Sequence, residues 1–154
     1  MRLAILSILV CVHTQAQYRE ASVCQAQATA RDGDQLTIRS HVNGELHHGH
    51  WWLAASQPCG TAAEPTIPLV GQDHGNVTGQ QWVQLSDAQA FLLFRKLKTR
   101  REIQGVTFLV RGTIKRNPYW WLALKAYQLG LFPHADATQV APVVLVIDSA
   151  EIIA

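Results

Sequence analysis

The stretch VTFLVRGTIK at residues 106–115 decides the fold, because its side chains alternate between two faces of an extended chain. One face carries Val106, Phe108 and Val110, and the other carries Thr107, Leu109 and Arg111. This period of two predicts a β-strand. Gly112 interrupts the pattern and predicts a bulge or bend in that strand.

A second alternating stretch, QLTIRSHV at residues 35–42, predicts another strand. It follows Asp32-Gly33, a turn signal, and precedes Asn43-Gly44, which predicts a hairpin turn. HHGHWWLAAS at residues 47–56 can then return as the paired strand. One face of the first strand is largely apolar and is expected to point into the core: Leu36, Ile38, Ser40 and Val42.

The rest of the chain predicts one helix and further strands. Ser86 and Gln89 form a capping box at the start of a helix expected over about residues 87–99. A short strand is expected at 67–70 and a buried closing strand at 143–147, extended beyond a bend by Ile152 and Ile153. Residues 119–131 form a nearly continuous apolar run that fits a helix or a strand.

The N-terminal segment MRLAILSILVCVHTQAQ has the order of a secretory signal peptide. Arg2 precedes an apolar run over 3–12, which is shorter than the roughly 20 residues that span a bilayer. Cleavage after Ala16 divides the chain into a signal peptide, 1–16, and one mature domain, 17–154. The alternative is a lipoprotein acylated on Cys11, although Val10 is bulkier than the residue usually found before such a cysteine.

Removal of residues 1–16 leaves two cysteines, Cys24 and Cys59, in an oxidising compartment. We therefore expect a disulfide between them, the alternative being two buried free thiols. The same cut removes Arg2 and leaves twelve basic against eleven acidic residues, a net charge of +1. This balance is too small to steer the whole molecule to nucleic acid or to a membrane.

The layout resembles that of a group of small exported bacterial proteins. The similar segments are DGDQLTIRSHV (32–42), Pro58-Cys59, LSDAQAFLLFRKL (85–97), VTFLVRGTIK and PVVLVIDSAEII (142–153). The resemblance implies a mainly β (α+β) fold, a small, partly open OB-like β-barrel with one helix packed on it. It implies no catalytic residue, and the chain departs from the group in its His-rich turn and in the Trp-rich segment after Asn117.

Histidines near the predicted hairpin turn are the best candidates for chemistry. His47, His48 and His50 carry imidazoles of the kind that bind zinc or copper, and His48 and His50 would project from one face of a strand. His41 and His74 could complete the shell. The alternative is a set of solvated histidines at an exposed tip, since no cysteine or carboxylate lies at an established metal spacing.

A basic segment is the second candidate, an anionic-ligand patch formed by Arg95, Lys96, Lys98, Arg100 and Arg101. OB-type barrels bind oligonucleotides or oligosaccharides, but export argues against a nucleic-acid partner. Cations at a helix C-terminus are also favoured without any ligand. The tryptophan pairs 51–52 and 120–121 could form a stacking platform, although core packing is favoured for them.

Two functions from different classes follow from the sequence. The favoured one is an exported, non-catalytic binding or interaction module, secreted or periplasmic, whose partner is an envelope protein or a small ligand. The alternative is a zinc- or copper-binding protein, or a metal-dependent hydrolase, that uses the histidine cluster. No nucleophile elbow and no H-E-x-x-H motif supports catalysis.

Overall fold

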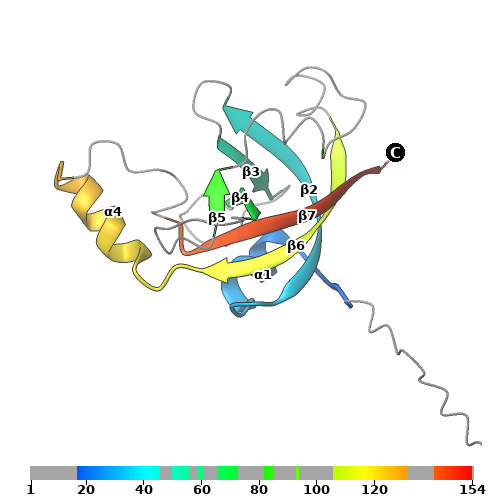
Figure 1. Cartoon of the computed structure of the whole chain (residues 1–154), viewed down its shortest axis with the longest axis horizontal. Coiled ribbons are helices and arrows are strands. Elements are labelled where there is room, and N and C mark those ends of the chain that lie inside the picture. Colours follow the sequence, from blue (N-terminus) through cyan, green and yellow to red (C-terminus); the bar gives the residue numbers. More distant parts are fainter. Residues whose placement is uncertain are drawn as a thin grey trace, which may run out of the picture.

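Seven strands and two helices make up the described part of the chain (Figure 1). The computed structural model describes residues 17–45, 50–55, 59–60, 66–72, 82–84, 93, 106–131 and 141–153. The strands are β1 (Arg19–Ala21), β2 (Gln35–Glu45), β3 (His50–Ala54), β4 (Thr66–Gln72), β5 (Trp82–Gln84), β6 (Thr107–Arg116) and β7 (Val143–Ile153). The helices are α1 (Val23–Thr29) and α4 (Trp120–Gln128).

Five of the strands pair in a circuit. β2 pairs with β3, β3 with β4, β4 with β7, β7 with β6, and β6 pairs back with β2. Within this circuit, every pairing is antiparallel except β4–β7, a parallel contact with only two paired positions, Leu69↔Leu145 and Val70↔Val146. β1 joins β2 in parallel, and β5 joins β4. The fold is therefore mainly β, a mixed sheet bent into a partly closed ring.

The inward face of β2 confirms the expectation drawn from its alternation. Its predicted core residues Leu36, Ile38, Ser40 and Val42 are buried, whereas Arg39 and His41 are exposed. The Asp32-Gly33 turn is also present, because Gly33 has a φ of +88° and the Asp34 carboxylate accepts a hydrogen bond from the Arg31 amide at 2.9 Å.

The turn predicted at Asn43-Gly44 is wrong. β2 continues through both residues, and its ladder with β3 extends to Glu45↔His50. Gly44 is needed for packing, because a Cβ atom there would lie 2.5 Å from Cε3 of its cross-strand partner Trp51. The local turn preference of Asn-Gly thus yields to the indole ring that covers this glycine.

The core fills the inside of the ring. It takes one or more large side chains from each strand of the circuit, and the fully buried ones include Trp51, Phe108, Leu36, Ile38, Leu53, Ile67, Leu69, Ile114 and Leu145. β7 is buried on both faces over residues 143–147, as expected for the closing strand. Val144 and Val146 form a second, smaller cluster with Val70.

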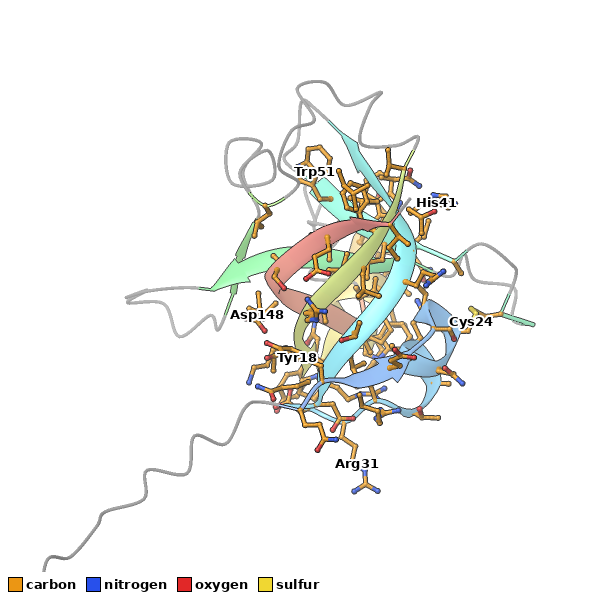
Figure 2. All side chains as sticks on the ribbon, turned by 90° about the vertical axis from the view of Figure 1, so that its right-hand side faces the viewer. Tyr18, Cys24, Arg31, His41, Trp51 and Asp148 are labelled. Atoms are coloured by element: carbon orange, nitrogen blue, oxygen red, sulfur yellow. A yellow bond between two sulfur atoms is a disulfide. The ribbon has the colours of Figure 1, made fainter. Side chains whose placement is uncertain are left out.

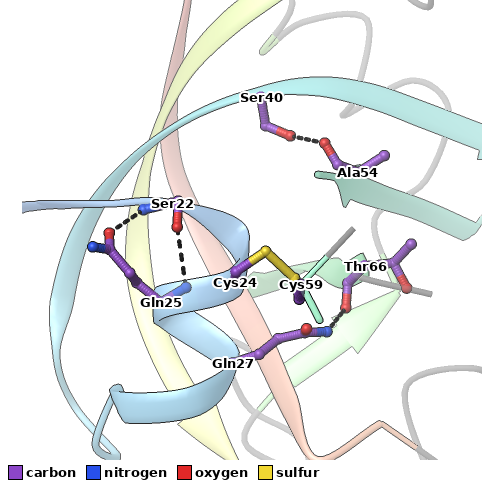
Figure 3. The surroundings of a disulfide bond; sticks show 8 residues. All are labelled: Ser22, Cys24, Gln25, Gln27, Ser40, Ala54, Cys59 and Thr66. Atoms are coloured by element: carbon purple, nitrogen blue, oxygen red, sulfur yellow. Dashed lines mark hydrogen bonds between the residues drawn. A yellow bond between two sulfur atoms is a disulfide. The ribbon is translucent and has the colours of Figure 1, made fainter. Parts of the chain in front are cut away.

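α1 was not predicted, and it joins the core from outside the ring. Ser22 and Gln25 form a reciprocal capping box: the Gln25 amide donates to Ser22 Oγ at 3.1 Å, and the Ser22 amide donates to Gln25 Oε1 at 2.9 Å (Figure 3). Val23 and Ala26 are buried in the main core cluster. The helix therefore contributes apolar surface although its sequence is short and polar.

The disulfide predicted between Cys24 and Cys59 is confirmed (Figure 3). It links α1 to the segment that precedes β4, across a sequence separation of 35 residues. Gln27 reinforces the same junction, because its Nε2 donates to the Thr66 carbonyl at 2.5 Å. One covalent link and one hydrogen bond thus hold α1 against the start of β4.

The irregularity predicted around Gly112 is present in the β6–β7 ladder. Arg111 pairs with Ser149 and Gly112 with Ile147, so Asp148 is the extra residue of a bulge. The backbones approach closely here: a Cβ atom at Gly112 would collide with the Val146 carbonyl oxygen and lie 2.9 Å from Leu145 Cγ. The position therefore requires glycine.

Gly112→Ala should lower the free energy of unfolding by about 2 to 3 kcal/mol, because the new methyl group meets backbone that cannot retreat without breaking the ladder. Urea unfolding measures the change. Thr113→Ala, one residue along β6, is the control and should cost less than about 1 kcal/mol. Equal losses for the two variants would contradict the close approach.

The helix expected over 87–99 lies outside the described residues except for Leu93. Leu93 is helical and half-buried, and it packs against the main core cluster. The ambiguous segment 119–131 contains a helix, α4. The expected fold has one packed helix, whereas the described residues contain two helices, α1 and α4.

Candidate functional site

Most ionisable side chains along β6 and β7 have structural partners. Arg111 Nη1 lies 2.6 Å from Glu151 Oε1, and the Tyr18 hydroxyl donates to Asp148 Oδ2 at 3.0 Å (Figure 2). Partial burial and this hydrogen bond raise the pKa of Tyr18. Asp148 is the bulged residue, so the contact fastens the segment before β1 to the irregular point of β7.

The histidine candidates are only partly placed. His50 pairs through its backbone with Glu45 at the end of the β2–β3 hairpin, and His47, His48 and His74 lie outside the described residues. His41 pairs with Ala54, four residues farther along the ladder, or about 13 Å away. Its Nδ1 is 3.3 Å from the Val106 carbonyl. The backbone ladder therefore places His41 opposite Ala54 and not opposite His50.

Among the described residues, no group of three or more histidine, cysteine or acidic side chains is placed to hold a metal ion. The zinc or copper site at His47, His48 and His50 stays a prediction. The same holds for the anionic-ligand patch, because Arg95, Lys96, Lys98, Arg100 and Arg101 all lie outside the described ranges. Two cations close to the end of β6 are engaged in the fold: Lys115 lies 3.8 Å from Asp32, and Arg116 donates to the Ala30 carbonyl at 2.6 Å.

α4 is a candidate site that sequence reasoning missed. Its ends are fixed by local interactions. At the start, the Asn117 side chain accepts a hydrogen bond from the Tyr119 amide at 3.1 Å. At the end, Gly130 has a φ of +72°, the Leu131 amide donates to Ala126 at 2.9 Å, and the Gly130 amide donates to Tyr127 at 3.0 Å. This is a Schellman motif, so the helix is bounded by its own sequence.

The surface of α4 is largely apolar and exposed. The helix contains no buried residue, and it lies to one side of the ring (Figure 1). Six large side chains on this segment are between 48% and 72% exposed: Tyr119, Trp121, Leu122, Tyr127, Leu129 and Leu131. We call these six residues the α4 surface. Single exposed apolar residues are common, but so many on one short segment make it a candidate interaction site.

The length of α4 strengthens this conclusion. It has nine residues, and helices shorter than about 12 residues are marginal in water without a packing partner. Within the described residues, its half-buried side chains (Trp120, Ala123, Leu124 and Ala126) provide the packing it has. A partner that covers the α4 surface would supply the rest.

The two tryptophan pairs behave differently. Trp51 is in the core and Trp52 is half-buried, as core packing of this pair requires. Trp121 is 52% exposed and Trp120 half-buried, so core packing is wrong for the pair on α4. The boundary signals Asn117-Pro118 and Gly130 could have identified the helix, but no sequence pattern reports that it lies outside the core.

Comparison with known proteins gives no positive match. No family model, no curated protein and no solved structure matches this chain. Within the described part of the chain, no helix is long and apolar enough to cross a bilayer.

Proposed function

We propose that this protein is an exported, non-catalytic binding module of the bacterial envelope, built on an OB-like barrel, whose partner docks on the α4 surface. The observation that carries the proposal is the α4 segment, a helix with defined ends and no buried residue that, together with its flanking residues, exposes six large apolar side chains. Natural monomers seldom leave such a patch uncovered.

The pairing order supports the OB-like assignment. Such barrels are small, five-stranded and partly open. The circuit β2-β3-β4-β7-β6 has five strands, and its two-residue contact between β4 and β7 leaves it partly open. The layout that resembles small exported bacterial proteins is the other support for this fold.

Two features support export. Residues 1–16 have the order of a signal peptide, and Cys24 and Cys59 are joined in a disulfide of the kind that persists in oxidising compartments. The mature protein then works in the periplasm or outside the cell, where envelope components are the partners within reach.

Site-specific photo-crosslinking in exporting cells tests the docking surface. A photoreactive phenylalanine analogue replaces Trp121, and in a matched control it replaces Ile152, an apolar residue of β7 that is 45% exposed. We expect a discrete adduct, with an envelope protein or with a lipid, from position 121 that the additional change Leu129→Ser removes, and none from position 152. Equal yields from both positions would refute docking on α4.

A further inference from the structure

The exposed side chains of α4 also indicate the chemistry of the partner that covers them. We propose that the α4 surface lies in the interface of an anionic phospholipid bilayer, with its aromatic and leucine side chains inserted among the lipid head groups and upper acyl chains. This inference rests on the proposed function and names the partner of the same surface. Four properties of the segment lead to it.

The first property is the kind of side chain exposed. Tyr119, Trp121 and Tyr127 combine a large apolar ring with one polar atom, and each is at least half exposed. Tyrosine and tryptophan gather at membrane–water interfaces because their rings enter the apolar layer while the polar atom stays hydrated. The leucines at 122, 129 and 131 supply the purely apolar contact.

The second property is charge. Residues 117–131 contain no carboxylate, and their single charged residue is Lys125, which is exposed. A carboxylate here would be repelled by anionic head groups, whereas a lysine is attracted to them. The segment therefore complements an anionic surface although the net charge of the chain is close to zero.

The third property is the distribution around the helix axis. At about 100° per residue, Trp121, Leu122 and Tyr127 are separated by about 100° to 140°, and so point in three directions. The polar side chains of the helix, Lys125 and Gln128, lie about 60° apart with Trp121 between them, so the indole ring and the lysine share one side of the helix. A groove in a protein, or a second copy of this chain, covers one apolar stripe of a helix. At a lipid interface, the Trp121 ring enters the head-group layer while the neighbouring Lys125 contacts the anionic head groups.

The fourth property is length. Nine residues extend about 14 Å, roughly half the 30 Å thickness of a hydrocarbon core. α4 cannot span the bilayer, and a short aromatic helix with one lysine fits an orientation parallel to the surface. The ring, held together by its own core and disulfide, would then stay on the aqueous side.

Vesicle flotation tests this proposal with protein that lacks residues 1–16, so that the apolar run 3–12 cannot bind lipid itself. The vesicles contain phosphatidylethanolamine with phosphatidylglycerol in one set and phosphatidylcholine alone in the other. The test variant is Trp121→Ser/Leu129→Ser, and the control is Ile152→Ser. Urea unfolding verifies that each variant keeps the stability of the ring.

We expect association with the anionic vesicles, weaker association with phosphatidylcholine, and a loss of about tenfold or more in Trp121→Ser/Leu129→Ser. Ile152→Ser should bind as the parent does, and Lys125→Glu should reduce binding to the anionic vesicles alone. No association with anionic vesicles, or equal binding by parent and test variant, would overturn the lipid proposal.

The outcomes also separate this inference from the proposed function. A discrete protein adduct at position 121 in cells, together with no vesicle binding, would overturn the lipid interface and leave the docking module in place. A dimer in sedimentation that Trp121→Ser/Leu129→Ser abolishes, again without vesicle binding, would identify a second copy as the occupant. No adduct and no vesicle binding would overturn both.

Discussion

The double substitution Cys24→Ser/Cys59→Ser should lower the free energy of unfolding by about 4 kcal/mol, because the disulfide closes a loop with a sequence separation of 35 residues. The link restricts the unfolded chain, and it also joins α1 to the start of β4. Urea unfolding of the oxidised parent and the double variant measures the difference.

The control for this variant is the parent protein after reduction, whose midpoint should fall to that of Cys24→Ser/Cys59→Ser. A further control, Gln27→Ala, removes only the hydrogen bond to Thr66 at the same junction and should cost about 1 kcal/mol. A double variant as stable as the oxidised parent would contradict a structural role for the disulfide.

Trp51→Ala should destabilise the ring by about 3 to 5 kcal/mol. The indole is 1% exposed, and it covers Gly44, where no side chain could fill the space it leaves. The cavity would open inside the ring, next to Leu53 on the same strand. Chemical unfolding followed by circular dichroism gives the change without relying on tryptophan fluorescence.

The adjacent Trp52→Ala is the matched control. Trp52 is half-buried and lies on the opposite face of β3, so its removal should cost less than about half as much. If the two variants lost the same stability, the inward orientation of Trp51 would be wrong.

Elements with a local signal could be predicted from the sequence. The alternation of residues 35–42 identified the inward face of β2, and Gly112 marked the irregular point of the β6–β7 ladder, whose extra residue lies on β7. The two cysteines that remain after the predicted cleavage identified the disulfide. The period of two and the glycine are each contained in a few neighbouring residues, whereas the disulfide followed from a count of cysteines over the whole chain.

Other elements depend on distant parts of the chain. Asn43-Gly44 has a turn signal, but Trp51 on the next strand packs over the glycine, and β2 continues through both residues. α1 has a polar, alanine-rich sequence with no apolar stripe, and only the capping box at Ser22 and Gln25, which we did not recognise in the sequence, could have indicated it. Sequence could have identified α4 by its ends, but its exposure depends on where the chain leaves β6.

The candidate sites also differ in whether a local sequence motif identifies them. The sequence directed attention to the His-rich turn and to the basic segment 95–101, because imidazoles and clustered cations are recognisable residue by residue. The α4 surface has no such motif, since apolar aromatic residues are the ordinary content of a core. The proposed role of this surface rests on the exposed positions of Tyr119, Trp121 and Leu129.

Both the prediction of the disulfide and the proposal of an envelope partner depend on export, and one measurement tests export directly. The full chain, including residues 1–16, is produced in a bacterial host, and its intact mass is determined in the cytoplasmic, envelope and extracellular fractions. We predict a chain that begins at Gln17, outside the cytoplasm, lighter than the reduced form by the hydrogens lost in one disulfide. A cytoplasmic chain that retains residues 1–16 and free thiols at Cys24 and Cys59 would contradict the account.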